Sequence, residues 1–377
     1  MKRLLFSAVM LFVLAGIITG TGKEIGKIAS IDAGKKEIII NVKSDTNLKM
    51  GDLLEIETES GKIILEATFP MMTTSKCKIK WKGKLSELSK GMAVYRYSTE
   101  TENKDELTGK SGETKKFGKI EFNFIAGGTF TMGSPENEKD RGNNETQHRV
   151  TLSPFWIGKY EVTQNQYRDV MGANPSYFKG DNLPVETVSW YDAVEYCNKL
   201  SEKQGLKPYY KIDKDRQDPN NKSNNDQLKY TVTILGGDGF RLPTEAEWEY
   251  ACRGGTTTVF HYGNSLDSSM ANFNGNYPYN ADKKIYREKT TKVGIFKPNA
   301  YGLFDMHGNV YEWCWDWYSE YAGDVNDPKG GDSGYSRVKR GGCWDYNGEY
   351  MRSAKRRTDY PHLNGYRMGF RLARAAF

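Results

Sequence analysis

The sequence predicts an α+β fold that is low in regular structure, preceded by a small β-barrel domain. The barrel is predicted because short runs of β-branched and aliphatic residues, such as Ile38 to Ile40 and Leu53 to Glu57, alternate with turn residues between Lys23 and Tyr97. The α+β domain is predicted because, from Phe117 onward, three capped helix patterns are set among long stretches rich in Gly, Asn and Pro. A chain of 377 residues is long enough for both domains.

The N-terminus has the layout of a secretory signal peptide. Lys2 and Arg3 precede an apolar run from Leu4 to Ile18, and small and polar residues follow. This run of about fifteen residues is shorter than the roughly twenty that cross a bilayer. We therefore expect residues 1–21 to be a signal peptide and the protein to be exported to the cell surface or periplasm of a bacterium. The alternative is a short uncleaved anchor, and membrane association is expected only through this segment.

The next two segments carry no predicted chemistry. Residues 22–98, the expected barrel, bring together no catalytic side chains that the sequence reveals, so a spacer or docking role is the default. Residues 99–116 are highly charged and poor in large apolar residues, a composition that cannot order itself by burial and is typical of a linker. The α+β domain is expected at 117–377.

The α+β domain should begin with a strand at 120–125, and its helices are marked by local capping chemistry. Each expected helix follows a Ser or Thr and ends at a glycine. They are 164–171 between Thr163 and Gly172, 190–204 between Ser189 and Gly205, and a third between Thr244 and Gly254, where Glu247 completes a capping box. Residues 211–229, with their Asn and Asp runs, are expected to form a surface insertion.

Composition limits the function. The low mean hydropathy of −0.71 excludes a membrane protein with many spans. The net charge is +6, with an excess of arginine near the C-terminus. That excess would suit an acidic partner or a nucleic acid. We expect internal ion pairs and hydrogen bonds to loop carbonyls from these arginines instead, and no nucleic-acid partner.

Cysteine and histidine spacing predicts no metal or redox motif. The five cysteines are far apart and odd in number, so at least one thiol stays free: Cys77, Cys197, Cys252, Cys314 and Cys343. We expect them to be small buried hydrophobes. The four histidines are equally scattered: His148, His261, His307 and His362.

The last forty residues alternate between a fixed frame and a changeable surface. The frame pieces are 337–344, 351–354 and 369–374. Between them lie Tyr, Asn, Asp, Gly, Thr and His residues, a composition that gives rigid contact area and adaptable hydrogen bonds, as in antibody paratopes. This is a composition for binding. We expect Trp344, Arg352, Ala354 and Phe370 to be buried frame, and Trp156, Trp190, Trp248 and Trp313 to lie in the core.

Seven motifs, in order along the chain, closely resemble the formylglycine-generating enzyme (sulfatase-modifying factor) family. They are 127–134 (GGTFTMGS), 160–163 (YEVT), 184–190 (PVETVSW), 241–251 (RLPTEAEWEYA), 299–306 (NAYGLFDM), 308–313 (GNVYEW) and 337–342 (RVKRGG). The resemblance runs from about Phe117 to Ala373. It implies a C-type-lectin-like fold for this domain.

The resemblance also implies what the chain lacks. Enzymes of this family that oxidise a cysteine to formylglycine resemble copper oxidases with two cysteine ligands between the Gly-Gly pair and the Arg-Ser-Ala segment, and Cu(I) prefers such soft thiolates. Here the window from Trp344 to Met351 holds no cysteine, and Cys343 stands where the family usually has Ser. We therefore expect no copper and no enzymatic activity. Cys197 and Cys252 match cysteines that pair, in some relatives, with positions that are Ser353 and Leu372 here, so those disulfides are not expected. Related iron-dependent sulfoxide synthases need a histidine cluster, which the scattered histidines do not predict.

The tail also resembles the variable proteins of diversity-generating retroelements, the treponemal type among them, in which a C-type-lectin-like scaffold holds altered residues. The resemblance implies a variable region at about 342–370 that binds an unknown protein or glycan on another cell or host surface, and a monomeric protein. The implied ligand-binding residues are Cys343, Asp345, Tyr346, Asn347, Gly348, Tyr350, Lys355, Arg357, Thr358, Asp359, Tyr360, His362, Leu363, Gly365 and Tyr366. The alternative function is a formylglycine-generating oxidase.

Family resemblance further implies a structural calcium site. Its expected ligands are Asp305, Gly308, Val310 and Glu312, an oxygen set that suits Ca²⁺. The alternative is that Glu312 is a buried structural acid. Asn272 and Phe273 match part of a second such site, but residues 274–289 depart from the pattern.

Overall fold

The computed structural model describes residues 24–32, 37–42, 53–58, 61–70, 74–81, 93–96 and 109–376. The chain divides into two compact units, Met1–Lys104 and Asp105–Phe377. The predicted signal peptide and residues 99–108 of the predicted linker lie outside the described residues. Within the described ranges, no helix is both long enough and apolar enough to cross a bilayer.

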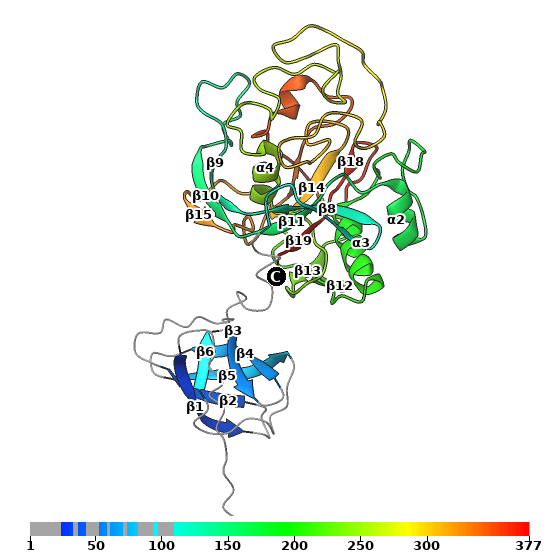
Figure 1. Cartoon of the computed structure of the whole chain (residues 1–377). Coiled ribbons are helices and arrows are strands. Elements are labelled where there is room, and N and C mark those ends of the chain that lie inside the picture. Colours follow the sequence, from blue (N-terminus) through cyan, green and yellow to red (C-terminus); the bar gives the residue numbers. More distant parts are fainter. Residues whose placement is uncertain are drawn as a thin grey trace, which may run out of the picture. The chain divides into compact units, whose positions relative to one another are not determined.

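The described strands of the first unit form a closed antiparallel barrel in the order β1-β2-β5-β4-β3-β6 (Figure 1). These strands are β1 (Glu24–Asp32), β2 (Glu37–Val42), β3 (Leu53–Thr58), β4 (Gly61–Pro70), β5 (Thr74–Trp81) and β6 (Ala93–Arg96). Ile38 and Ile40 are buried whereas Ile39 between them is half-buried, the alternation expected of a strand with one face inward. Leu54 and Ile56 of β3 and Val94 of β6 are also buried.

Three helices of the second unit begin where the capping residues predict. They are α2 (Gln164–Met171), α3 (Trp190–Lys203) and α4 (Glu245–Arg253). In each, the Ser or Thr side chain accepts from the amide three residues later, and the side chain of that later residue accepts from the cap amide. Helix α3 ends one residue before the predicted Gln204. The helix predictions are confirmed, and the second unit is otherwise mostly strand and loop.

Two sheets of this unit join segments that are distant in sequence. The first has the order β19-β11-β8-β7 and the second β15-β10-β9. Their strands are β7 (Thr114–Phe117), β8 (Ile120–Ile125), β9 (Gly128–Met132), β10 (His148–Leu152), β11 (Phe155–Gly158), β15 (Val325–Asn326) and β19 (Ala373–Ala375). The linker predicted to reach residue 116 is therefore too long at its C-terminal end, because β7 pairs with β8. The polar run Thr-Lys-Lys at the start of this strand resembles linker sequence.

A hairpin and a further sheet hold the C-terminal region. The hairpin is β12 (Tyr210–Gln217) with β13 (Tyr230–Ile234), and the sheet has the order β17-β16-β14-β18. Its strands are β14 (Tyr311–Trp317), β16 (Arg337–Arg340), β17 (Arg357–Asp359) and β18 (Met368–Gly369). The short 3-10 helix η3 (Gly348–Met351) lies between β16 and β17. The predicted surface insertion thus begins as a regular strand, and the predicted variable region loops out of one four-stranded sheet.

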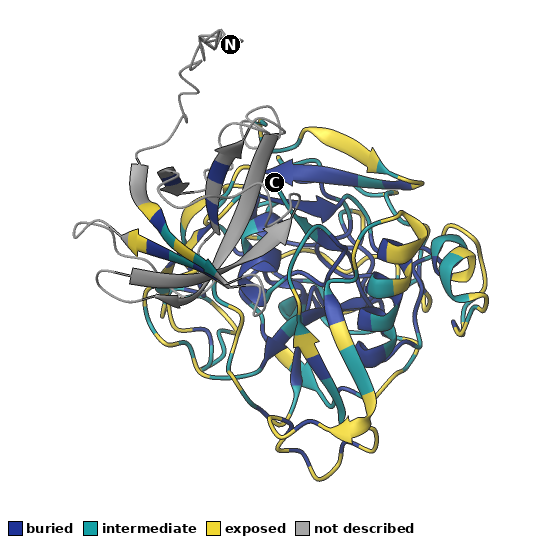
Figure 2. Ribbon diagram, turned by 90° about the horizontal axis from the view of Figure 1, so that it is seen from below, coloured by how far each residue is buried: buried dark blue, intermediate teal, exposed yellow. Residues whose placement is uncertain are grey.

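Aromatic side chains dominate the interior of the second unit. Trp190, Trp248 and Trp313 are fully buried, and Trp156 and Trp344 nearly so. Figure 2 shows the buried residues gathered inside this unit and the exposed residues on its periphery. The prediction that these tryptophans are core is confirmed, as is the burial of Arg352, Ala354 and Phe370.

Candidate ligand-binding surface

Strand pairing fixes both ends of the predicted variable region. Strand β16 enters it and pairs with β14, β17 returns to pair with β16, and β18 leaves it beside β14. Gly342 adopts a positive φ of 79°, and a Cβ at this position would come within 2.4 Å of the Met351 sulfur. A side chain there would be strained and would clash, so the turn that starts the region requires glycine.

Buried arginines anchor the region from below. Arg352 is fully buried and donates to Glu138 and Glu145 and to the carbonyl of Asp140. Arg356 makes a two-point contact with Glu245, at 2.7 Å for each pair of atoms. Burial opposes ionisation of Glu145, but the Arg352 guanidinium outweighs it and lowers the pKa of that carboxyl. Each charge has its partner at hand, which a buried ion pair requires.

Two further buried arginines follow the same rule. Arg340 donates to Glu249 and to the carbonyl of Lys355, and Arg371 donates to both oxygens of Glu312. These pairs confirm that the C-terminal arginines serve mainly inside the domain.

We define the display surface as the predicted ligand-binding residues whose side chains are not buried. Arg357, Leu363 and Tyr366 are exposed, and the others are half-buried. Those others are Asp345, Tyr346, Asn347, Tyr350, Lys355, Thr358, Asp359, Tyr360, His362 and Gly365. Most of the display surface is therefore made of side chains that are partly covered by their neighbours.

Two of the predicted ligand-binding residues are placed elsewhere. Cys343 and Gly348 are buried, so the prediction that they contact a ligand is wrong for both. The Cys343 thiol donates to Asp345 Oδ1 at 3.1 Å. Burial, together with the neighbouring Asp345, raises the pKa of this thiol well above its ordinary value. It is therefore held as a neutral thiol inside the frame.

One half of the display surface is an aromatic cluster with cations over it. The rings of Tyr346 and Tyr350 meet edge to face at 4.9 Å. Arg367 lies 4.9 Å from the Tyr366 ring and 5.5 Å from the Tyr346 ring, and Arg357 lies 5.3 Å from the Tyr350 ring. Tyrosine and arginine, together with tryptophan, are enriched among the residues that contribute most of the binding energy at protein interfaces.

The other half rests on the insertion that follows β12. Asn225 Nδ2 donates to the Tyr360 hydroxyl at 2.9 Å, and His362 Nδ1 lies 3.1 Å from Asp226 Oδ1. Lys339 joins the two halves, because its ammonium contacts Asp359 at 2.8 Å and lies 4.7 Å from the Tyr311 ring, against which Tyr346 packs. Lys339 and Tyr311 therefore link the two halves.

Aromatic residues outside the predicted region extend this surface, and sequence reasoning missed them. Tyr177 is 70% exposed, and its ring lies 5.9 Å from that of Tyr366. Phe178 meets the Trp344 ring edge to face at 5.4 Å, and Tyr286 stacks near the same ring. Exposed aromatics after the turn signal Asn174-Pro175 were the available clue.

The predicted calcium ligands are brought together but are not equivalent. Both oxygens of Glu312 are bonded to Arg371, and one also accepts from the Trp248 indole at 2.7 Å. Asp305 is different: Oδ2 accepts from the Gly294 amide at 2.6 Å, whereas Oδ1 is buried with no partner among the described residues. Burial raises the Asp305 pKa to about 6.

Glu161 adds a third carboxylate that the sequence analysis did not single out. It accepts from the Val310 amide at 3.2 Å and from Asn309 Nδ2 at 2.7 Å. Burial, and then the charges of Asp305 and Glu312, raise its pKa well above the ordinary value. No group of three His, Cys, Asp or Glu residues within the described ranges is arranged to hold a metal ion. Glu312 therefore does not fit as a calcium ligand, and Asp305 Oδ1 is the one predicted carboxylate atom left without a donor.

Two of the four scattered histidines meet inside the domain. The rings of His261 and His307 stack at 4.8 Å, and His307 Nδ1 lies 2.6 Å from the Met351 carbonyl. Burial lowers the pKa of His307 to about 4 and that of His261 to about 2. Both rings are neutral at physiological pH and serve as packing beneath the region.

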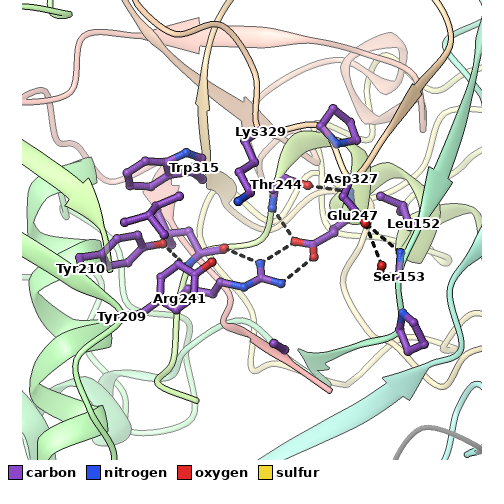
Figure 3. A pocket seen from close by; sticks show the side chains of 15 residues that line it. Leu152, Ser153, Tyr209, Tyr210, Arg241, Thr244, Glu247, Trp315, Asp327 and Lys329 are labelled. Carbon is purple, nitrogen blue, oxygen red and sulfur yellow. Dashed lines mark hydrogen bonds and ion pairs between the residues drawn. The ribbon is translucent and has the colours of Figure 1, made fainter. Parts of the chain in front are cut away.

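A cavity of about 230 Å³ lies beside Arg241. Figure 3 shows the Arg241 guanidinium facing the Glu247 carboxylate, and both contacts are 2.6 Å. Glu247 also accepts from the Thr244 amide, and Tyr210 accepts from the Leu242 amide. Arg241 and Glu247 satisfy each other's charge, so this pair serves the fold.

Comparison with known proteins gives concordant results. Residues 109–376 match the model of the sulfatase-modifying factor enzyme 1-like domain. The chain is 48% identical over 207 residues to chaperone protein LppX of Paenibacillus barcinonensis, covering 52% of this chain and 71% of that protein. It is 31% identical over 284 residues to the formylglycine-generating enzyme of Thermomonospora curvata, covering 66% and 91%. The chain spans only 37% to 52% of several longer curated relatives.

One solved structure links the fold to the tail. Treponema denticola variable protein 1 superposes with a TM-score of 0.58 at 34% identity, covering 70% of this chain and 98% of that one. This chain therefore has a fold shared by a variable protein and by formylglycine-generating enzymes. The resemblance read from its motifs is confirmed.

Proposed function

The chain belongs to the family that carries a sulfatase-modifying factor enzyme 1-like domain, and from that premise we propose that it is an exported ligand-binding display protein. Its C-type-lectin-like domain presents residues of the region 342–370 to a protein or glycan on another cell or host surface. The similarity to Treponema denticola variable protein 1 supports this role.

The observation that carries the proposal is that the C-terminal region alternates between buried, ion-paired residues and residues at the surface. Arg340, Arg352, Arg356 and Arg371 are buried and ion-paired, whereas the tyrosines between them reach the surface. Removing one partner of a buried ion pair costs about 3 to 5 kcal/mol, but exposed substitutions usually change stability by less than about 0.5 kcal/mol. A scaffold of this kind tolerates change at its surface positions only.

Formylglycine generation is the competing function, since the Thermomonospora curvata relative bears that name over nearly its whole length. Our proposal excludes it because copper oxidation of this kind uses two thiolates. The window from Trp344 to Met351 has no cysteine. Cys343 beside it is held as a buried neutral thiol.

The remaining parts of the proposal are smaller. The N-terminal barrel acts as a spacer between the exported N-terminus and the display domain, and the protein is a monomer. A calcium ion is proposed only at Asp305, with the carbonyls of Gly308 and Val310, because Oδ1 of Asp305 lacks a donor. Glu312 is assigned a structural role as the ion-pair partner of Arg371. Such an ion would neutralise Asp305 and fix its loop.

Two experiments separate the functions. The purified chain is incubated with copper, a thiol reductant, oxygen and a Cys-x-Pro-x-Arg peptide, and the peptide mass is followed. We expect no conversion of thiol to aldehyde, and conversion that Cys343→Ser abolishes would overturn the display proposal in favour of the oxidase. The DNA beside the gene is also sequenced. A near-copy of its last hundred or so bases, differing chiefly at adenines, beside a reverse transcriptase gene is expected.

A further inference from the structure

Two cations of the display surface lack an anionic group of their own among the described residues. Arg357 is exposed, and its guanidinium makes no ion pair there. The Lys355 ammonium lies 4.0 Å from Glu145 Oε1, but both oxygens of that carboxylate already accept from Arg352 at 2.8 Å. Burial, and then the Arg352 charge, lower the pKa of Lys355. Both cations stand over the Tyr350 ring, Lys355 at 5.5 Å and Arg357 at 5.3 Å, so uncompensated positive charge gathers at one point of the surface.

The fold gives no structural reason for the arginine at position 357. In the β16–β17 pair, Arg357 lies directly opposite Lys339. Like charges directly opposite each other destabilise an antiparallel pair of strands. Asp359 compensates Lys339 at 2.8 Å, whereas no described carboxylate compensates Arg357. An anionic group of a ligand bound beside Arg357 would remove this repulsion.

Carboxylates set among these cations disfavour a polyanionic ligand. Asp359 is paired with Lys339, and Asp345 is paired with Arg367. Glu349 of η3 adds a third half-buried carboxylate. A nucleic acid or a sulfated polysaccharide carries charge at nearly every unit and would bring some of its anions against these carboxylates, which repel them. The arrangement therefore favours a ligand with one isolated acidic group.

A series of ring contacts joins the unpaired cations to an exposed apolar area. Tyr350 meets Tyr346 at 4.9 Å, and Arg367 stands over the rings of both Tyr346 and Tyr366. The Tyr366 ring then lies 5.9 Å from that of Tyr177. Tyr177 is 70% exposed and Tyr366 is 39% exposed. The surface thus offers positive charge at one end and exposed rings at the other.

The geometry points to a protein ligand whose binding segment places an Asp or Glu carboxylate beside Arg357 and Lys355 and an apolar side chain on Tyr177 and Tyr366. A guanidinium binds a carboxylate through two parallel hydrogen bonds, which are stronger than bonds between neutral groups. Exposed tyrosine rings bury apolar area when an aliphatic side chain covers them. This inference rests on the proposed function, because it names the class of partner for the same surface.

An acidic sugar could supply the carboxylate but fits the rest of the surface less well. The rings of Tyr346, Tyr350 and Tyr366 each carry a cation over one face. These cations leave less ring face for the flat stacking that a sugar ring makes on an aromatic side chain. An aliphatic side chain of a protein packs against ring edges as well as ring faces.

Selection of random peptides displayed on phage against the full chain tests the inference, with acidic and neutral glycans on an array in parallel. The recovered peptides should be enriched in Asp or Glu together with an apolar residue. Their affinity should fall as salt rises, because salt screens exposed charge contacts. Peptides without acidic enrichment, or binding of acidic glycans but of no peptide, would overturn the inference and leave the display function standing. Absence of binding by every peptide and glycan would count against the display function as well.

Charge variants locate the carboxylate. Arg357→Gln and Lys355→Gln should each weaken the selected acidic peptides about threefold to tenfold. Arg357→Gln should not lower the melting temperature, because it removes the repulsion with Lys339; a purely structural arginine would lower it. Glu349→Gln should strengthen binding, since the Glu349 charge acts at Lys355. Lys329→Gln is the matched control, because it removes one exposed positive charge outside the display surface. Acidic peptides that bind both cation variants as tightly as this control would refute the carboxylate site.

Discussion

Truncation of Phe370 should unfold the display domain far more readily than truncation of the exposed tail residues. Phe370 is fully buried and meets the Tyr196 ring at 5.3 Å and the Tyr167 ring at 6.4 Å. Leu363 and Tyr366 are 37% and 39% exposed. The two classes are separated by only a few residues of sequence, so a purely local account predicts no difference between them.

The expected magnitude follows from burial. A buried Phe truncated to Ala costs about 3 to 5 kcal/mol, whereas exposed substitutions stay within about 0.5 kcal/mol each. In a domain of this size, 1 kcal/mol corresponds to roughly 2 to 4 °C in melting temperature. Phe370→Ala should therefore lower the melting temperature by about 6 to 20 °C. The double variant Leu363→Ala, Tyr366→Ala should lower it by no more than about 4 °C.

Tryptophan fluorescence during heating measures the difference in the right domain, because every tryptophan except Trp81 lies in the second unit. The double variant should also lose affinity for any ligand of the display surface while keeping its transition. If the double variant melts as early as Phe370→Ala, then the tail is core and the display reading is refuted.

Three further predictions concern buried ionisable groups. Glu312→Gln breaks the pair with Arg371 and should cost about 3 to 5 kcal/mol equally with and without chelator; a loss seen only in the presence of Ca²⁺ would show that Glu312 is a ligand. Burial, with the nearby Glu245 charge, raises the Asp316 pKa to about 8, above its unfolded value, so the native state binds the extra proton and stability should fall as pH rises from about 4 to 8. The difference in unfolding free energy between Asp316→Asn and the unaltered protein should grow over that window and stay flat above it, and a pH-independent difference would count against the burial of this acid. Cys343 should resist maleimide labelling at pH 8 in the native state, measured by peptide mass, because its thiol is buried with a raised pKa; rapid labelling would place it on the surface.

Local features of this fold were readable from the sequence because their causes are local. The three helix starts follow from a hydroxyl at the cap and a carboxylate or amide three residues on. The burial of Trp344 and Phe370 follows from their place in repeated frame motifs. The capping interactions span only a few residues, so the residue types alone specify them, whereas the rings that bury Phe370 are far away in sequence.

The contacts that shape the site are distant in sequence, which is why they could not be predicted. Arg352 meets Glu145, a partner 207 residues away. Tyr177, which precedes α3 in the sequence, lies beside the ring of Tyr366 near the C-terminus. The residues next to Arg352 or Tyr177 in the sequence do not indicate which residue each will contact. Only the folded domain brings each pair together.

The half-buried state of most display residues limits how freely the surface can vary. Tyr346 packs against two separate core clusters and the Tyr311 ring, so a small polar residue there would remove packing as well as ligand contact. Leu363 and Tyr366 contact less of the frame and can change at little cost. Diversification at every display position is therefore compatible with folding only if the frame holds stability in excess of what any one surface sequence needs. Buried ion pairs such as Arg356 with Glu245 favour one arrangement of the frame. The aromatic interior supplies the excess stability, since large rings contribute much of the buried apolar area.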